Sequence, residues 1–209
     1  MASPFYWIVL LIAIGGEFLV PIVLSFFYPK YHYLHDGLGK LSNPKSPVQW
    51  IYRIWQFVVG IIMIIGGVGL FYSMGAISIF LMILLILYGV GGRMIPAVLS
   101  IVDIYDVEWA PARVYSISRF IGFFALQLAS LGLSGLLCWI GPAVHLSALP
   151  GALMFISSLI GILTYALSKM SHRKEFEGTV LQHKGLWENL FLLFIYLPFV
   201  IWSILSLCY

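Results

Sequence analysis

Residues 5–27 read FYWIVLLIAIGGEFLVPIVLSFF, an apolar run with a single charged residue, Glu17. A helix of about 20 apolar residues crosses the roughly 30 Å hydrocarbon core of a bilayer. No basic segment precedes the run and no small-residue cleavage site follows it, so we expect a retained span and not a signal peptide. Glu17 would then lie near the middle of the membrane. A charged group there costs several kcal/mol unless it is paired or hydrated.

The composition of the whole chain agrees with a membrane protein. Of its 209 residues, 62% are hydrophobic and only 9% are charged, whereas a soluble domain carries about 25% charged residues. Further apolar runs cover about 49–72, 76–97, 114–141, 148–168 and 186–208. We therefore predict an all-α fold: a six-helix transmembrane bundle that forms a single integral membrane domain over residues 1–209.

The basic residues are distributed very unequally among the connections. All 11 Lys and Arg lie in or beside the connections that follow the first, third and fifth spans. The positive-inside rule places these loops in the cytoplasm and both termini outside, in a multi-pass protein of the cell membrane. The net charge of +3 reflects these loops, so no nucleic-acid partner is expected.

Polar residues recur at helical spacing inside the apolar spans. Glu17, Pro21 and Ser25 share one face of the first span, and Arg119 and Gln127 share a face of the fourth. Lipid does not tolerate such groups, so the polar faces should meet. We expect a polar, cationic cavity open to the cytoplasm, with Glu17 as its floor. The predicted ligand-binding residues are Arg53, Gln56, Arg93, Arg113, Arg119 and Gln127, with His32, His35 and Asp36 from the first loop.

Two readings of Glu17 remain open from the sequence. It could form a buried ion pair with Arg119 that only fixes how the helices pack. It could also be a catalytic acid or base, with Asp103, Asp106 or Glu108 as its partner. The segment YGVGGRMIP, residues 88–96, contains three glycines and a proline. These residues predict a break in the third span beside Arg93.

The first loop carries the pattern His32-x-x-His35-Asp36. Two histidines at this spacing can point the same way, but the apolar spans offer no further histidine as a ligand. We therefore predict no metal and no cofactor, and interfacial histidines that titrate near neutral pH. Cys138 and Cys208 lie near the outer ends of their spans, where either a disulfide or two separate thiols is compatible with the sequence.

Three segments resemble a known family. They are PKYHYLHDGLGKLSNPKSPVQWIYRI at 29–54, GGRMIP at 91–96 and GLWENLFLLFIYLPFVIWSI at 185–204. Their order is similar to that of the six-span prokaryotic membrane family named domain of unknown function 998. The chain departs from that family at residues 35–39, where HDGLG stands in place of a frequent Ile-Ser-x-Leu-Gly run. The resemblance implies a six-span fold and no particular activity.

Three functions are compatible with these features. The first is binding or transport of an amphiphile such as a lipid, because arginine forks suit phosphate and carboxylate headgroups. The second is a small membrane enzyme that uses Glu17 on an apolar substrate. The third is a non-catalytic scaffold or assembly factor. Membrane lipids and a small amphiphilic ligand are the expected partners, and the oligomeric state is left open.

Overall fold

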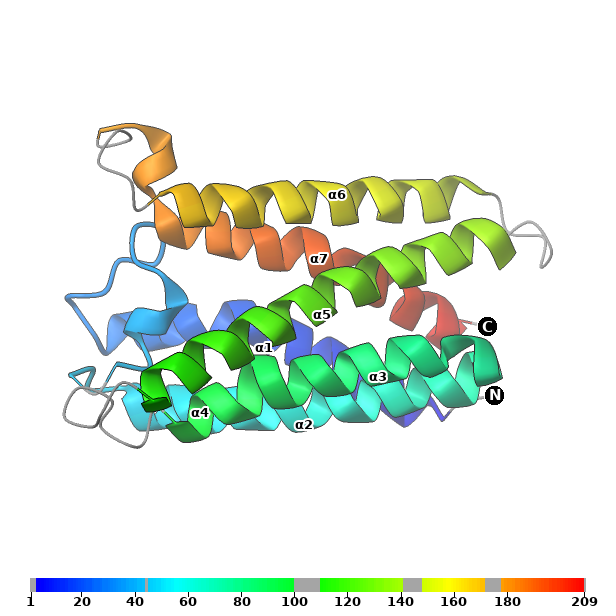
Figure 1. The fold of residues 1–209 in the computed structure, drawn as a ribbon, viewed down its shortest axis with the longest axis horizontal. Coiled ribbons are helices and arrows are strands. Elements are labelled where there is room, and N and C mark those ends of the chain that lie inside the picture. The colour runs from blue at the N-terminus through cyan, green and yellow to red at the C-terminus, as the bar shows by residue number, and fades with distance from the viewer. Residues whose placement is uncertain (1–2, 44, 100–109, 141–147, 172–177, 209) are drawn as a thin grey trace. The chain divides into compact units, whose positions relative to one another are not determined.

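The computed structural model describes residues 3–43, 45–99, 110–140, 148–171 and 178–208, and the regular structure in these ranges is helical. The α-helices are α1 (Pro4–Phe26), α2 (Gln49–Met74), α3 (Ile79–Leu87), α4 (Ile95–Leu99), α5 (Ala110–Ile140), α6 (Ala148–Met170) and α7 (Lys184–Cys208) (Figure 1). A π-helical segment, Tyr88–Met94, joins α3 to α4 and is called the π segment below. Short 3₁₀ turns cover Leu38–Lys40, Gly75–Ser78 and Val180–Gln182.

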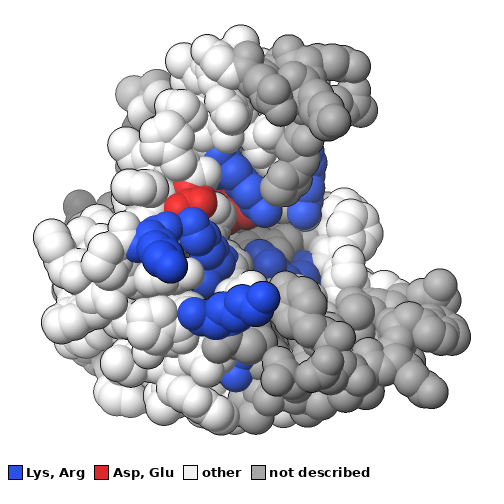
Figure 2. All heavy atoms as spheres, turned by 90° about the vertical axis from the view of Figure 1, so that its left-hand side faces the viewer, with Lys and Arg blue, Asp and Glu red and all other residues white. Residues whose placement is uncertain are grey.

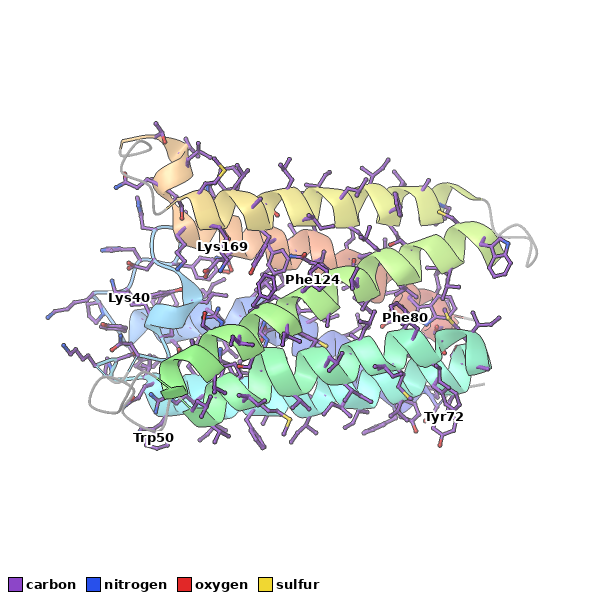
Figure 3. All side chains as sticks on the ribbon, viewed as in Figure 1. Lys40, Trp50, Tyr72, Phe80, Phe124 and Lys169 are labelled. Carbon is purple, nitrogen blue, oxygen red and sulfur yellow. The ribbon has the colours of Figure 1, made fainter. Side chains whose placement is uncertain are left out.

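Much of the described chain is long and apolar enough to cross a membrane. Five such segments are Pro4–Phe26, Gln49–Leu99, Val114–Trp139, Pro150–Met170 and Lys184–Cys208. The chain is therefore built as an integral membrane protein with an all-α fold. Figure 3 shows Trp50 and Tyr72 projecting from opposite ends of α2, and both side chains are exposed. Aromatic side chains in these positions match the belts at the two interfaces of a bilayer.

The helices form two compact units. Unit 1 contains Met1–Tyr31 and Gly39–Leu126, and unit 2 contains His32–Leu38 and Gln127–Tyr209. The first half of α5 thus belongs to unit 1 and its second half to unit 2. The short segment His32–Leu38 belongs to unit 2, although the residues on both sides of it belong to unit 1.

In unit 1, α1 begins with a regular cap. The Ser3 hydroxyl accepts a hydrogen bond from the Phe5 amide at 3.4 Å, and Pro4 occupies the first turn, where its missing N–H costs nothing. The helix buries one face, made of Trp7, Leu10, Ala13, Ile14, Glu17, Pro21 and Leu24. The predicted polar stripe of the first span therefore lies on the buried side of α1.

A tight turn sends the chain from α2 back along itself as α3. Gly75 ends α2 with φ +67°, a left-handed conformation that favours glycine. The Ser78 hydroxyl then bonds the carbonyl oxygens of Leu70 at 3.0 Å and Gly75 at 2.9 Å. As a result α2 packs against α3 and the π segment as well as α1.

The α-helix of the third span is interrupted where the sequence suggests a break, but the interruption is the π segment, so the helix widens and continues. Glycines seat the π segment closely against two helices. A Cβ on Gly89 would lie 2.5 Å from the Gly60 carbonyl oxygen of α2. A Cβ on Gly122 of α5 would lie 2.8 Å from the carbonyl carbon of Gly91 and closer still to Gly92. The glycines of YGVGGRMIP thus allow close packing of backbones, as small residues do in membrane helices.

Unit 2 is organised by the packing of α6 against α7 along their lengths. A Cβ on Gly161 would lie 3.0 Å from the Ile195 Cδ1 atom, so these helices also approach closely. The second half of α5 joins α6 through Gly151, where a Cβ would lie 2.7 Å from the Cys138 nitrogen. Small residues therefore set the helix spacing in both units.

Candidate functional site

A buried ion pair occupies the interior of unit 1. The Arg93 Nη2 atom donates to the Glu17 carboxylate, and each side chain is only 3% exposed. Of the two readings that the sequence left open, the buried ion pair is the one found, with Arg93 and not Arg119 as the partner of Glu17. Arg93 lies in the π segment, and the wider turn of a π-helix gives its residues other directions than a regular α-helix does. A regular helical period read from sequence does not include that difference.

Aromatic side chains surround the Arg93 guanidinium. Its Nε atom donates to the Tyr88 hydroxyl at 2.6 Å. Its central carbon lies 5.4 Å from the Tyr88 ring centroid and 5.5 Å from that of Phe123. A desolvated cation gains about 2 kcal/mol or more from such rings. The aromatic contacts therefore add to the stabilisation that Glu17 supplies.

Arg119 lies beside the same phenyl ring. Its central carbon is 5.5 Å from the Phe123 centroid and 5.6 Å from that of Tyr115, and its Nη1 atom donates to the Tyr115 hydroxyl at 3.1 Å. Two of the predicted arginines, Arg93 and Arg119, thus meet at Phe123, and one of them carries the acid as its partner.

Arg53 and Gln56 are buried on α2. The Arg53 Nε and Nη2 atoms donate to the Ser42 carbonyl oxygen at 3.3 and 3.0 Å. Its guanidinium carbon lies 5.5 Å from the Trp50 ring centroid. Arg53 therefore fastens the turn that precedes α2.

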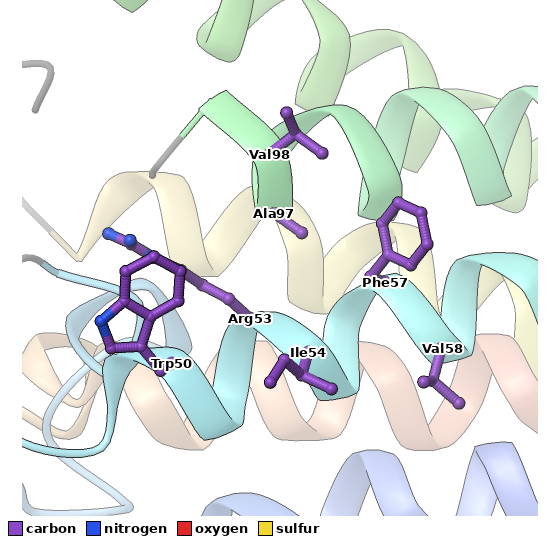
Figure 4. A pocket seen from close by; sticks show the side chains of 7 residues that line it. All are labelled: Trp50, Arg53, Ile54, Phe57, Val58, Ala97 and Val98. Atoms are coloured by element: carbon purple, nitrogen blue, oxygen red, sulfur yellow. The ribbon is translucent and has the colours of Figure 1, made fainter. Parts of the chain in front are cut away.

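The described residues of α2 and α4 line a cavity of about 260 Å³ (Figure 4). Its walls are Trp50, Arg53, Ile54, Phe57, Val58, Ala97 and Val98. Of the predicted ligand-binding residues whose side chains are described, only Arg53 belongs to this lining. The cavity is apolar and does not match the polar, cationic cavity that the sequence predicts.

In unit 2, the segment His32–Leu38 docks on the start of α7. The Leu186 and Gly185 amides donate to the carbonyl oxygens of Leu34 at 2.8 Å and His35 at 3.4 Å. The first N–H groups of a helix have no acceptor within the helix. Here the carbonyl oxygens of His32–Leu38, far away in the sequence, serve as these acceptors.

Side chains of α7 complete this docking. The Leu38 amide donates to the Glu188 carboxylate at 2.8 Å, and the Tyr33 hydroxyl donates to the Asn189 amide oxygen at 2.9 Å. Burial raises the pKa of the Tyr33 phenol above its ordinary value, which keeps it protonated as a donor. The Lys184 Nζ atom lies 3.7 Å from the Glu188 Oε1 atom, one turn along the helix.

The predicted histidines lie in this docking region. The His35 ring is 3.9 Å from the ring of His183 and 6.4 Å from the ring of His32, centroid to centroid. The Asp36 carboxylate accepts a hydrogen bond from the His32 amide at 2.8 Å. Among the described residues, no three His, Cys, Asp or Glu side chains come together as metal ligands.

Serine hydroxyls join α5 to α6 inside unit 2. The Ser130 and Ser158 hydroxyls lie 2.7 Å apart, and the Ser134 hydroxyl donates to the Ser130 carbonyl oxygen at 2.7 Å. Gln127 is buried nearby in sequence, and its amide nitrogen has no hydrogen-bond partner among the described residues. The predicted polar face of the fourth span therefore has two parts. Arg119 lies in the part that belongs to unit 1, and the serine hydroxyls lie in the part that belongs to unit 2.

Some predicted catalytic and ligand-binding residues lie outside the residues that the structure describes. Asp103, Asp106, Glu108 and the Arg113 side chain are among them. Cys138 and Cys208 are not joined by a disulfide.

Sequence reasoning missed the aromatic partners Tyr88 and Phe123, and also His183, which immediately precedes α7. Only Tyr88 had a usable signal, because it stands five residues before Arg93 in a glycine-rich segment and π-helices pair residues at that spacing.

No family model, no curated protein and no solved structure matches the chain. The resemblance to the family of unknown function 998 therefore stays a prediction.

Proposed function

We propose that the chain crosses the membrane six times and binds an amphiphile of the bilayer at the cavity between α2 and α4. The observation that carries the proposal is this apolar cavity of about 260 Å³ with Trp50 and Arg53 in its lining. An acyl chain would occupy the cavity, and an anionic headgroup would lie toward the start of α2.

Six crossings follow from the segment Gln49–Leu99. Its 51 residues would extend about 76 Å as one helix, more than twice the roughly 30 Å of a hydrocarbon core. The turn at Gly75 instead folds α3 back against α2. We therefore count this segment as two crossings, α2 and the continuous helix of α3, the π segment and α4.

An acyl chain is the occupant that the walls favour. Phe57, Val58, Ala97 and Val98 offer apolar surface, and the exposed faces of α2 and α4 would meet lipid tails. Lipid tails are as apolar as these walls, so an acyl chain would be held there by van der Waals packing.

The charge near the cavity selects the headgroup. Arg53 is held in place by the Ser42 carbonyl, and Lys45 is exposed four residues before Gln49, where α2 begins. Figure 2 faces the end where α1 ends and α2 begins, and shows Lys and Arg side chains on it. Juxtamembrane basic residues attract anionic lipid by about 1 kcal/mol each. We therefore propose an anionic amphiphile, on the cytoplasmic side that the positive-inside rule assigns.

Filling the cavity tests the proposal. Val98→Trp should occupy the space, whereas Ile83→Trp adds the same ring to α3 outside the lining; Val98 and Ile83 are 49% and 48% exposed. The protein would be exposed to mixed micelles of phosphatidylglycerol and phosphatidylcholine, and bound lipid counted by native mass spectrometry. We expect Val98→Trp to lose phosphatidylglycerol at least about tenfold, equal to about 1.4 kcal/mol. Equal retention by the two variants would overturn the proposal.

The described residues give no comparable support to acid–base chemistry at Glu17. Its carboxylate is buried and bonded to Arg93, so a substrate would first have to displace that partner. The pair supports a packing role, which the proposed ligand binding does not exclude.

A further inference from the structure

We propose that His35 and His183 form a binding site for a divalent transition-metal ion that favours imidazole, such as Zn²⁺, Cu²⁺ or Ni²⁺. The site lies in unit 2, whereas the apolar cavity is lined by unit 1. It is thus independent of the proposed amphiphile.

The two imidazoles are brought together by backbone contacts. His35 comes from the segment His32–Leu38, and His183 immediately precedes α7. The pairs Gly185 with His35 and Leu186 with Leu34 join these elements by amide-to-carbonyl bonds. The rings lie 3.9 Å apart between centroids, although 148 positions separate the residues in the sequence. Metal ligands gain affinity when the fold holds them in place before the ion arrives.

His183 carries an unsatisfied ring atom. Its Nδ1 is buried and has no hydrogen-bond partner among the described residues. A buried ring nitrogen without a partner loses its hydrogen bonds to water and gains none in the protein, which is unfavourable. A metal ion bound at an imidazole nitrogen would remove that cost, and a neutral imidazole nitrogen is the commonest protein ligand for such ions. The orphaned atom therefore points to a ligand.

The donor set decides the class of metal. No third ligating side chain converges on the two rings among the described residues, so water would fill the remaining positions. Among the described histidines, His32 is the next imidazole, with its ring centroid 6.4 Å from that of His35. Imidazole ligands suit Zn²⁺, Cu²⁺ and Ni²⁺, whereas Mg²⁺ and Ca²⁺ favour oxygen. The site should therefore discriminate against Mg²⁺.

The experiment uses the full chain in detergent, without a polyhistidine tag and after treatment with a chelator. ZnCl₂, NiCl₂ and MgCl₂ are titrated by calorimetry, and bound metal is measured by mass spectrometry after desalting. We expect about one Zn²⁺ per chain and no Mg²⁺. His35→Gln and His183→Gln should each weaken Zn²⁺ binding at least about tenfold. His145→Gln is the matched control and should bind like the wild type.

A second measurement does not depend on variants. Diethyl pyrocarbonate modifies accessible imidazoles, and peptide mass spectrometry locates the product. We expect Zn²⁺ to protect His35 and His183 in the wild-type protein and to leave His145 unprotected. Unchanged modification of His35 and His183, or Zn²⁺ binding by both glutamine variants at the wild-type affinity, would overturn the proposal.

Discussion

The two units bury polar groups in different ways. Unit 1 buries full charges: Glu17 and Arg93 are paired, and Tyr88 and Phe123 lie against the guanidinium. Unit 2 buries hydroxyls, and those of Ser134 and Ser158 bond carbonyl oxygens one turn back in their own helices. A hydroxyl can find a partner within its own helix, whereas a buried charge needs one from elsewhere. The interior of unit 1 should therefore tolerate far less change than that of unit 2.

Removing one member of the ion pair should have the largest effect. In Arg93→Gln, the Glu17 carboxylate would be left buried without its counter-charge, at a cost of about 3–5 kcal/mol. Unfolding in mixed micelles would measure the loss. Ser158→Ala is the control from unit 2 and should cost about 0.6 kcal/mol. The double variant Glu17→Gln with Arg93→Gln should lose less than the sum of the two single variants. Equal losses in Arg93→Gln and Ser158→Ala would contradict the comparison.

Two glycines of α5 offer the next test. Gly122→Ala would push a Cβ into the backbone of the π segment and should cost about 1–3 kcal/mol. Gly135, in the unit 2 half of the same helix, has nothing within 4 Å of an added Cβ. Gly135→Ala should stabilise by up to about 1 kcal/mol, because alanine favours a helix. Thermal unfolding of both variants would show the opposite signs, and a destabilised Gly135→Ala would refute the contrast between the two halves.

The serine pair should have a smaller effect, and its two members should be coupled. Ser130→Ala and Ser158→Ala each remove the same 2.7 Å contact. Each should cost about 0.6 kcal/mol, with about 1.7 kcal/mol as the upper range for such bonds. The double variant should cost less than the sum, because the second substitution breaks no further bond between these residues. Strict additivity in a double-mutant cycle would show that the two hydroxyls do not interact.

The smallest expected effect is a pH dependence from Tyr33. Burial raises the pKa of this phenol above its ordinary value of 10.0. Above about pH 10 the unfolded chain loses the proton while the folded chain keeps it, so the free energy of unfolding falls as pH rises. Tyr33→Phe should remove this part of the decline and leave the rest. Unfolding of both proteins at about pH 8 and about pH 11 would measure it, and parallel declines would contradict a perturbed Tyr33.

The sequence predicts the helical class well because apolar length alone specifies it. The first predicted span, 5–27, differs from α1 by one residue at each end. The sequence predicts that the last span begins at 186, whereas α7 begins at Lys184. The helix therefore begins two residues earlier than predicted. At this end the Gly185 and Leu186 amides donate hydrogen bonds to carbonyl oxygens of the segment His32–Leu38. A local pattern cannot contain a partner that lies so far away.

The partner of Glu17 could not be predicted for a related reason. The sequence offered Arg119 only as one possible partner, and a regular helical period does not include the direction that a π-helical turn gives to Arg93. The sequence did identify Glu17, Arg93 and Arg119 as polar groups inside spans. The sequence could not show which of these groups pair with one another. The pairing depends on how the helices pack, including the close backbone contacts at Gly89 and Gly122 beside the π segment.

The docking of His32–Leu38 on α7 also has a consequence for synthesis. Leu38 and Glu188 are bonded across 150 positions. At roughly 5–20 residues per second, a ribosome needs roughly 8–30 s to make the intervening chain. The hydrogen bonds of His32–Leu38 to α7 can therefore form only after the intervening spans have been made and have entered the bilayer. A chain stopped before Lys184 would keep the Glu17–Arg93 pair and leave His32–Leu38 without the helix that it caps.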